Sequence, residues 1–232
     1  MIGIIGAMDI EVAKLKEMLG NTVSHQKAGM TFIEGSCYGK DVVVVRSGIG
    51  KVNAGICAQI LVDKFNVDCI INTGIAGSLS AQIDIGDIVL SEDTLHHDMD
   101  ASGFGYAVGV IPQMKESIFK GDKQLIELAK KCQENKIPNI KTHIGRVVSG
   151  DQFISDKDKK QWLVDTFHGY CTEMEGAAIA QTAYLNDVPF LIIRAISDKA
   201  DDSATLDYPT FEALAVENSV KLLSAMIEEM EF

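Results

Sequence analysis

The stretch Phe190-Leu-Ile-Ile-Arg-Ala-Ile-Ser-Asp198 (FLIIRAISD) decides the class of fold, because an apolar run leads into an arginine, a serine and an aspartate. A short apolar run without polar alternation is typical of a strand that helices cover on both faces. Arg194, Ser197 and Asp198 then lie toward the carboxyl end of that strand. In an open α/β sheet this end lines the crevice that receives a ligand. The stretch therefore predicts a helix-covered sheet with a functional edge.

The rest of the chain repeats this pattern, since short β-branched runs alternate with amphipathic segments. Such alternation predicts a largely parallel sheet covered by helices. Segments 30–38 and 41–46, separated by Gly39-Lys40, are typical of a β-hairpin, so we expect a mixed sheet. We expect strands at 2–6, 42–46, 68–72, 86–91, 143–148 and 189–196, and helices at 9–19, 51–65, 121–135, 155–167, 175–185 and 209–230.

The chain shows no linker, repeat or low-complexity segment, and its four prolines are spread along it. We therefore predict that residues 1–232 form a single domain. The last helix is expected to carry Pro209 in its first turn, where proline is tolerated, and to pack on the sheet. Residues 96–120 are rich in glycine and aromatic residues, which predicts a long functional or interface loop.

Charge and cysteine content limit the classes of partner. The 21 Lys and Arg residues are outnumbered by 33 Asp and Glu residues, giving a net charge of -12. Without a basic face, nucleic acid and anionic membranes are poor partners. The five cysteines are widely spaced and form no C-x-x-C pair, unlike a disulfide framework or a zinc site.

No targeting or anchoring segment is expected. Met1–Met8 is apolar but lacks the basic residues that open a signal peptide. No uncharged stretch approaches the ~18–20 apolar residues that a membrane span requires. Together with the unpaired cysteines, this pattern predicts a cytoplasmic protein.

Two glycine-containing stretches invite a nucleotide-binding interpretation. Gly3-Ile-Ile-Gly-Ala-Met8 lies between an expected strand and a helix, but the G-x-G-x-x-G pattern needs glycines where Ile5 and Met8 stand. Ser47-Gly-Ile-Gly-Lys-Val52 resembles a phosphate loop, yet it lacks the earlier glycine and the Ser or Thr after the lysine. We therefore expect no cofactor.

Metal binding and covalent catalysis are also disfavoured. His96-His97-Asp98-Met99-Asp100 contains possible ligands, but adjacent residues on an extended segment point to opposite faces and do not easily share one ion. A loop or interface cluster is the better interpretation, and no metal site is predicted. Ser149-Gly150-Asp151 has the composition of a common turn, and the chain contains no G-x-S-x-G nucleophile motif.

Several charged residues follow the expected strands. The stretch CTEMEGAAIAQTA places Glu173 and Glu175 at the head of a helix of small apolar residues, and Glu11 opens another helix. Acids are favoured in first helical turns, so ordinary helix starts explain each one alone. Their number, together with Arg194 and Asp198 at a strand end, favours a site where these charges converge.

Six short motifs follow one another along the chain. They are Ile4-Ile-Gly-Ala-Met8 followed by Glu11, Ser47-Gly-Ile-Gly-Lys51, Asn72-Thr-Gly74, Val148-Ser-Gly-Asp151 with Phe153-Ile154, Glu173-Met-Glu-Gly176, and Arg194-Ala-Ile-Ser-Asp198. In this order the chain closely resembles the 5'-methylthioadenosine/S-adenosylhomocysteine nucleosidase family of the purine nucleoside phosphorylase-like superfamily. The resemblance implies a three-layer α/β/α fold around a mixed, twisted sheet. It also implies hydrolysis of 5'-thio-substituted adenosines, and of 5'-deoxyadenosine, with a role in methionine salvage.

The resemblance implies roles for the charged residues. Asp198 is the implied general acid at adenine N7, because adenine leaves poorly as an anion. Glu11 is the implied base for a water molecule that attacks the oxocarbenium-like ribose from the opposite face. Arg194 and Glu173 are implied to fix that base and water, whereas Glu175 accepts hydrogen bonds from the ribose hydroxyls.

The resemblance also implies a substrate pocket. Phe153 stacks on adenine, the Ile154 backbone reads its polar edge, and Met174 packs on sugar and base. Further implied substrate-binding residues are Met8, Ile49 and Tyr208 at the 5'-alkylthio group, and Ile75, Gly77 and Ser197. A loop of a second subunit completes the pocket in this family, which implies a homodimer and matches Ala101, Phe104, Tyr106 and Pro112 here.

One position departs from the family pattern, and three alternatives stay open. Ile75 stands where the family commonly has Ser, which removes a hydrogen bond worth roughly 0.5–1.5 kcal/mol. The alternatives are a phosphate-dependent nucleoside phosphorylase, an aminofutalosine nucleosidase and a nucleoside-binding protein that has lost its chemistry. The acids Glu11, Glu175 and Asp198 argue against the last, since binding alone needs neither an acid nor a base.

Overall fold

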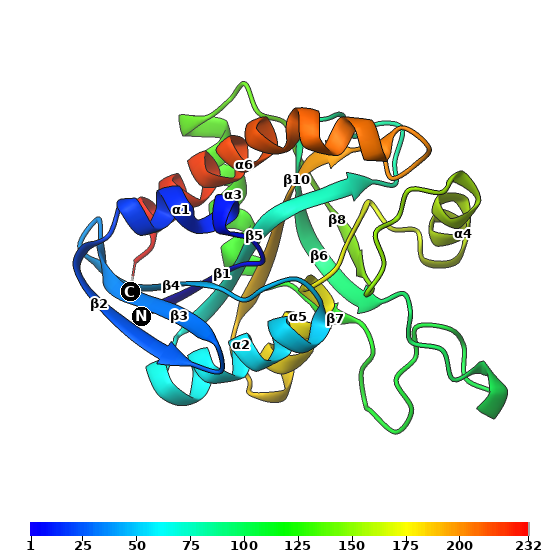
Figure 1. Ribbon diagram of the computed structural model, residues 1–232, viewed down its shortest axis with the longest axis horizontal. Coiled ribbons are helices and arrows are strands. Elements are labelled where there is room, and N and C mark those ends of the chain that lie inside the picture. The colour runs from blue at the N-terminus through cyan, green and yellow to red at the C-terminus, as the bar shows by residue number, and fades with distance from the viewer. Residues whose placement is uncertain (232) are drawn as a thin grey trace.

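A computed structural model describes residues 1–231, which form one sheet with helices on both faces (Figure 1). The strands are β1 (Ile2–Gly6), β2 (Gly20–Lys27), β3 (Met30–Cys37), β4 (Lys40–Arg46), β5 (Cys69–Ser78), β6 (Ile88–His96), β7 (Phe119–Lys120), β8 (Thr142–Ser149), β9 (Cys171–Glu173) and β10 (Phe190–Asp198). The helices are α1 (Asp9–Glu17), α2 (Lys51–Phe65), α3 (Lys123–Lys136), α4 (Lys157–Phe167), α5 (Gly176–Leu185) and α6 (Ala204–Glu229), with a 3-10 turn at Ser102–Phe104.

The sheet is mixed and partly closes on itself. Its strand order is β10-β6-β8-β9-β5-β1-β4-β3-β2, and β10 also pairs with β5. The centre is parallel, because β5 lies between β1 and β10 with all three running in one direction. Antiparallel pairing joins β10 to β6 and β5 to β9, and the β2-β3-β4 meander forms the outer edge. The carboxyl ends of β1, β5 and β10 therefore meet at one edge.

Helices cover both faces because the central strands are apolar on both. In β4, Val42 and Val44 join the core under α1, α3 and α6, whereas Val43 and Val45 join the core under α2 and α5. Figure 1 shows α1 and α6 on one side of the sheet and α2 and α5 on the other. A smaller cluster packs beneath α4 through Leu163. This arrangement confirms the three-layer α/β/α prediction.

The predicted hairpin is present, whereas several element boundaries differ from expectation. Strands β3 and β4 pair through Cys37 and Lys40, and Tyr38 and Gly39 adopt φ of 50° and 76°, as a tight primed turn requires. Strands β5 and β6 extend beyond the expected 68–72 and 86–91, because their polar ends stay paired inside the sheet. The polar edge strand β2 and the short strands β7 and β9 were not predicted, since they lack an apolar run.

The last helix corrects a prediction. It begins at Ala204 rather than at 209, so Pro209 lies inside the helix and not in its first turn. Proline removes the hydrogen bond to the carbonyl four residues earlier, here that of Thr205. The preceding residues Ala204–Tyr208 have no apolar run, so no sequence pattern indicated the extra turn. None of the helices within residues 1–231 combines the length and apolar character that a membrane crossing requires.

Candidate active site

A cavity of about 580 Å³ opens at the edge where the parallel strands end. Its wall comes from the ends of β5, β9 and β10, from the turns after β1 and β4, and from the first turns of α1 and α6. The lining residues are Ala7, Met8, Glu11, Ile49, Ile75, Ala76, Gly77, Phe153, Thr172, Glu173, Met174, Glu175, Ser197, Asp198, Thr205, Tyr208 and Pro209. The cavity thus lies where an α/β sheet is expected to bind its ligand.

Glu11 reaches the cavity from the first turn of α1. Its Oε2 accepts hydrogen bonds from the backbone N–H groups of Ala7 (2.7 Å) and Met8 (2.9 Å), and Oε1 accepts from that of Ile75 (3.2 Å). Burial raises the pKa of Glu11, and the nearby charge of Arg194 opposes that rise. Glu11 is therefore both a helix-start residue and a carboxylate held at the cavity wall.

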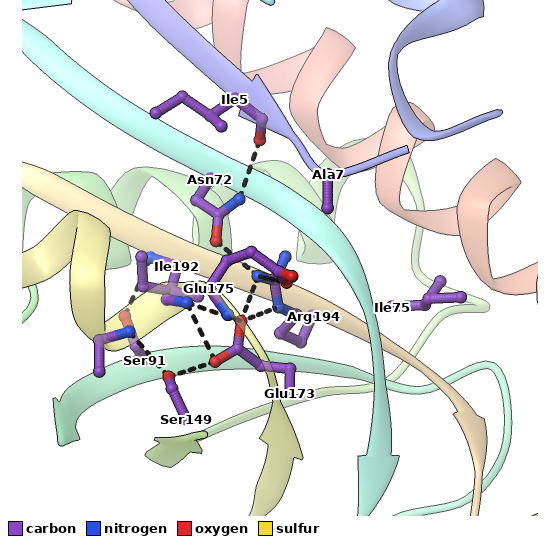
Figure 2. Close-up of polar contacts among 12 residues, drawn as sticks. Ile5, Ala7, Asn72, Ile75, Ser91, Ser149, Glu173, Glu175, Ile192 and Arg194 are labelled. Atoms are coloured by element: carbon purple, nitrogen blue, oxygen red, sulfur yellow. Dashed lines mark hydrogen bonds and ion pairs between the residues drawn. The ribbon is translucent and has the colours of Figure 1, made fainter. Parts of the chain in front are cut away.

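Glu173 on the cavity wall and Arg194 behind it form a buried ion pair (Figure 2). Arg194 Nε donates to Glu173 Oε2 at 3.0 Å, and Nη2 donates to the same oxygen. Glu173 also accepts from the Ser149 hydroxyl and from the backbone N–H groups of Glu175 and Gly176. Burial favours the neutral acid, but Arg194 and these donors outweigh it and hold the pKa of Glu173 below its ordinary value.

Glu175 accepts fewer hydrogen bonds than Glu173. Its Oε1 accepts from the Gly50 N–H at 2.9 Å, and Oε2 lies 3.7 Å from Arg194 Nη2. Burial and the neighbouring charge of Glu173 raise the pKa of Glu175. Glu175 therefore carries a destabilised negative charge that faces the cavity.

Asp198 ends β10 on another part of the wall. Its Oδ2 accepts from the Ser197 hydroxyl and its Oδ1 from the Ala200 N–H, both at 2.8 Å. A Cβ at Gly77 would lie only 2.7 Å from Asp198 Oδ1, so glycine lets the strand and the carboxylate approach. Burial raises the pKa of Asp198, and the charges of Asp207 and Asp201 act in the same direction. A carboxyl group in this setting retains a proton more readily than an exposed one.

The structure brings together most of the residues that the sequence predicted. The predicted residues that line the cavity are Met8, Glu11, Ile49, Ile75, Gly77, Phe153, Glu173, Met174, Glu175, Ser197, Asp198 and Tyr208. Arg194 stands behind this wall, and the Ile154 side chain is buried with the α4 cluster instead. The predicted partner-subunit residues lie outside the cavity, on the segment after β6 that extends away from the sheet in Figure 1, where Phe104 is 88% exposed.

Five residues that line the cavity were not predicted from the sequence. Ala7 and Thr172 adjoin predicted residues within the quoted motifs, so their positions gave a usable signal. Ala76 lies between Ile75 and Gly77 on β5. Thr205 and Pro209 line the cavity only because α6 begins earlier than expected.

The predicted cluster that begins at His96 and His97 contacts neighbouring parts of the protein. His96 ends β6 and its Nε2 lies 2.9 Å from Gln181 Oε1, while His97 is fully buried beside Gly150. His96 therefore belongs to the end of the sheet, whereas His97 is buried in the turn that follows, so the predicted loop begins at His97. Within residues 1–231 no group of three His, Cys, Asp or Glu side chains is arranged to hold a metal ion.

Comparison with known proteins identifies the class of protein. The model of the phosphorylase superfamily matches residues 1–228. A 5'-methylthioadenosine/S-adenosylhomocysteine nucleosidase of Tolumonas auensis is 40% identical over 230 residues, which cover 99% of both chains. The fold, the site at the strand ends and these matches place the chain in the phosphorylase superfamily. More narrowly, it belongs to the 5'-methylthioadenosine/S-adenosylhomocysteine nucleosidase family, which confirms the resemblance.

Solved structures agree with this assignment. The Neisseria meningitidis 5'-methylthioadenosine/S-adenosylhomocysteine nucleosidase, in complex with methylthio-immucillin-A, has a TM-score of 0.95 and 37% identity over 99% of both chains. The futalosine hydrolase of Helicobacter pylori strain 26695 has a TM-score of 0.94 and 32% identity, covering 99% of this chain and 97% of that one. The fold is thus shared by a protein named as a nucleosidase and by one named as a futalosine hydrolase.

Proposed function

We propose that this protein hydrolyses the N-glycosidic bond of 5'-methylthioadenosine and S-adenosylhomocysteine, releasing adenine and a thioribose product. One observation carries the proposal: Glu11 and Asp198 contact β5 at Ile75 and Gly77, two residues apart, within one cavity. A water base and a proton donor that reach one cavity are the two groups that a hydrolytic glycosidase of the inverting type uses.

Asp198 supplies the proton that the leaving group needs. Adenine leaves poorly as an anion, so protonation or a strong hydrogen bond at N7 lowers the barrier to cleavage. Burial raises the pKa of Asp198, which favours its proton-carrying form, and the Ser197 and Ala200 bonds fix its carboxyl plane. Phe153, half exposed at the cavity, stacks on the adenine ring, and the Ile154 backbone reads its polar edge.

Glu11 activates the water that attacks the anomeric carbon. As the glycosidic bond breaks, the ribose becomes oxocarbenium-like, and Glu11 takes a proton from the incoming water. Arg194 and Glu173 support this subsite from behind. Glu175 accepts hydrogen bonds from the ribose hydroxyls and places negative charge near the developing cation.

The charge of the cavity favours water over phosphate as the attacking group. Its lining includes four carboxylates, Glu11, Glu173, Glu175 and Asp198, and no Lys or Arg. The nearest cation is Arg194, and its Nε and Nη2 are already bonded to Glu173 and Asn72. A phosphate dianion needs several free donors, which this wall does not offer.

The 5' end of the substrate meets an apolar region. Met8 and Ile49 line the cavity, and the Tyr208 hydroxyl lies 3.4 Å from the Met8 sulfur. We infer that a homodimer completes this region with Ala101, Phe104, Tyr106 and Pro112 of the second copy. The support is an exposed apolar surface on and before α2, where Ile49, Val52 and Ile56 are 54%, 72% and 44% exposed, together with exposed Phe104.

The remaining predictions follow from this activity. Residues 1–232 act as one nucleosidase domain, since β1 near the start and β10 near the end belong to the same sheet. The substrates arise from S-adenosylmethionine chemistry, so the enzyme serves methionine salvage in the cytoplasm. Aminofutalosine is the second candidate substrate, because the futalosine hydrolase of H. pylori shares the fold.

Adenine release in phosphate-free buffer tests the proposal. The panel contains 5'-methylthioadenosine, S-adenosylhomocysteine, 5'-deoxyadenosine and aminofutalosine, with adenosine and inosine as controls. We expect adenine from the two 5'-thio nucleosides at a rate that added phosphate does not increase. A strict requirement for phosphate would replace the hydrolase assignment with a phosphorylase, and cleavage of aminofutalosine alone would select the second candidate.

A further inference from the structure

Asn72 lies outside the cavity wall but contacts the residue behind it. It occupies the centre of β5, opposite Ile5 of β1 and Ile192 of β10, and its side chain is fully buried. Its Nδ2 donates to the Ile5 carbonyl at 2.9 Å, and its Oδ1 accepts from Arg194 Nη2 at 2.6 Å (Figure 2). Asn72 therefore ties the guanidinium of Arg194 to the backbone of the neighbouring strand.

Among the described residues, two nitrogen atoms of the Arg194 guanidinium are hydrogen-bonded, and the third is not. Glu173 on β9 accepts from Nε and Nη2, and Asn72 on β5 accepts from Nη2. Nη1 has no hydrogen bond within residues 1–231 and lies against Gly74, where a Cβ would collide with it. The same hypothetical Cβ would lie 2.7 Å from Glu11 Oε1. Nη1 and the Glu11 carboxylate thus converge beside Gly74.

We propose that Asn72 is a positioning residue that aims Arg194 Nη1 at the water activated by Glu11. This inference rests on the proposed hydrolytic function. Glu173 Oε2 alone leaves the guanidinium able to pivot about a single acceptor atom, whereas a second acceptor on another strand fixes its plane. The amide of Asn72 is itself oriented by the Ile5 carbonyl, so the chain of contacts runs from β1 to the water subsite.

The inferred role of Asn72 requires a neutral side chain at position 72. The charged and titratable groups around Arg194 and Glu11 are Glu173 on β9, Glu175 before α5, Asp198 on β10 and Tyr208 on α6. Arg194 is the cation that counters this negative charge and lowers the pKa of Glu11. An aspartate in place of Asn72 would add a further carboxylate against Arg194 and weaken its effect on Glu11.

The test compares Asn72→Ala and Asn72→Asp with Thr73→Val as the matched control. Thr73 is the next residue of β5, equally buried, and its hydroxyl lies 2.6 Å from that of Ser219 on α6, away from Arg194. Wild-type adenine release is measured first, followed by kcat, KM and the pH profile of each variant. For Asn72→Ala we expect kcat about 10²-fold lower, as for a misplaced catalytic group, with KM changed less than threefold.

The pH profile separates positioning from a merely structural role. In both Asn72 variants the acid limb of kcat/KM should move to higher pH, because Glu11 and Glu175 lose part of the Arg194 charge that lowers their pKa values. Thr73→Val should lower thermal stability and leave kcat and the acid limb unchanged. Should Asn72→Ala not fold, Asn72→Asp decides, since it keeps the size and the acceptor. Active wild type with unchanged kcat and acid limb in the Asn72 variants overturns the inference, whereas inactive wild type refutes the proposed function itself.

Discussion

Glu173 and Glu175 are two residues apart, yet neutralising each one should have opposite consequences for stability. In Glu173→Gln, either orientation of the new amide turns its NH2 group toward groups that donate to Glu173, among them Arg194 and Gly176. The variant also removes the closest counter-charge of the buried Arg194 and leaves only the more distant Glu175 and Glu11. Breaking a buried ion pair from one side costs about 3–5 kcal/mol. Glu173→Gln should therefore be among the most destabilising single changes in the chain.

The free energy converts into a measurable shift. An unfolding entropy of about 2.1 cal/mol/K per residue over 232 residues gives about 490 cal/mol/K, so 3–5 kcal/mol lowers Tm by about 6–10 °C. In Glu175→Gln the amide oxygen still accepts from Gly50, and the repulsion with Glu173 disappears. Its Tm should stay within about 2 °C of wild type or rise, which corresponds to about 1 kcal/mol.

The pH dependence of these effects has opposite signs. The pKa of Glu173 is depressed in the folded protein, so its stabilisation is present above its unfolded pKa and is lost as pH falls through the folded value. The pKa of Glu175 is raised, so its charge destabilises the fold at neutral pH and the penalty vanishes on acidification. Differential scanning calorimetry from pH ~8 to ~5 should show Glu175→Gln losing its relative advantage. Equal Tm shifts for the two variants, or no loss in Glu173→Gln, would refute the assignment of Arg194 to Glu173.

Three further predictions concern turnover and assembly. Asp198→Asn should lower kcat by about 10²–10⁴-fold, because the amide keeps the shape of the side chain but cannot transfer a proton. Binding of 5'-methylthioadenosine should still be measurable by calorimetry. Equal turnover in this variant would remove Asp198 from the mechanism. The acid limb of the wild-type kcat/KM profile should lie above the ordinary pKa of a glutamate, because burial raises the pKa values of Glu11 and Glu175, and Glu11→Gln should remove most of the activity. If the second copy covers the 5' end of the substrate, Phe104→Ala should raise KM for 5'-methylthioadenosine and leave KM for adenosine nearly unchanged. A monomeric mass in light scattering at assay concentration would contradict that arrangement.

Sequence patterns predicted the centre of the fold well because burial on both faces leaves a visible signature. The run Val42–Val45 and the run Phe190–Ile193 are apolar without alternation, and both lie inside the sheet. The polar strand β2 gives no such signature, because it lies at the sheet edge and its residues are mostly exposed. The ends of β5 and β6 were missed for a different reason: they contain glycine or polar residues and yet remain paired within the sheet.

The site itself was predicted unevenly. Motif order brought Glu11, Glu175 and Asp198 to one cavity, and the structure places all three on its wall. Neither the family pattern nor the residue spacing indicated that Glu173 has every oxygen engaged by protein donors, which makes it a support for Arg194 and for the start of α5. Such a distinction depends on three-dimensional contacts between β8, β9 and β10, which no local pattern contains.

Burial destabilises the negative charges of Glu11 and Glu175 in the protein without substrate, and this favours the proposed reaction. Glu11 and Glu175 both have raised pKa values, so their negative charges are poorly stabilised by the surrounding protein before catalysis. When positive charge develops on the ribose, it provides the counter-charge that these groups lack. The attraction is therefore stronger in the transition state than in the ground state, which is the condition for lowering the barrier rather than only binding substrate. Glu173, already neutralised by Arg194, gains little from that charge. In the proposed mechanism, the CTEMEG motif thus combines one carboxylate that stabilises the fold with one that stabilises the oxocarbenium ion.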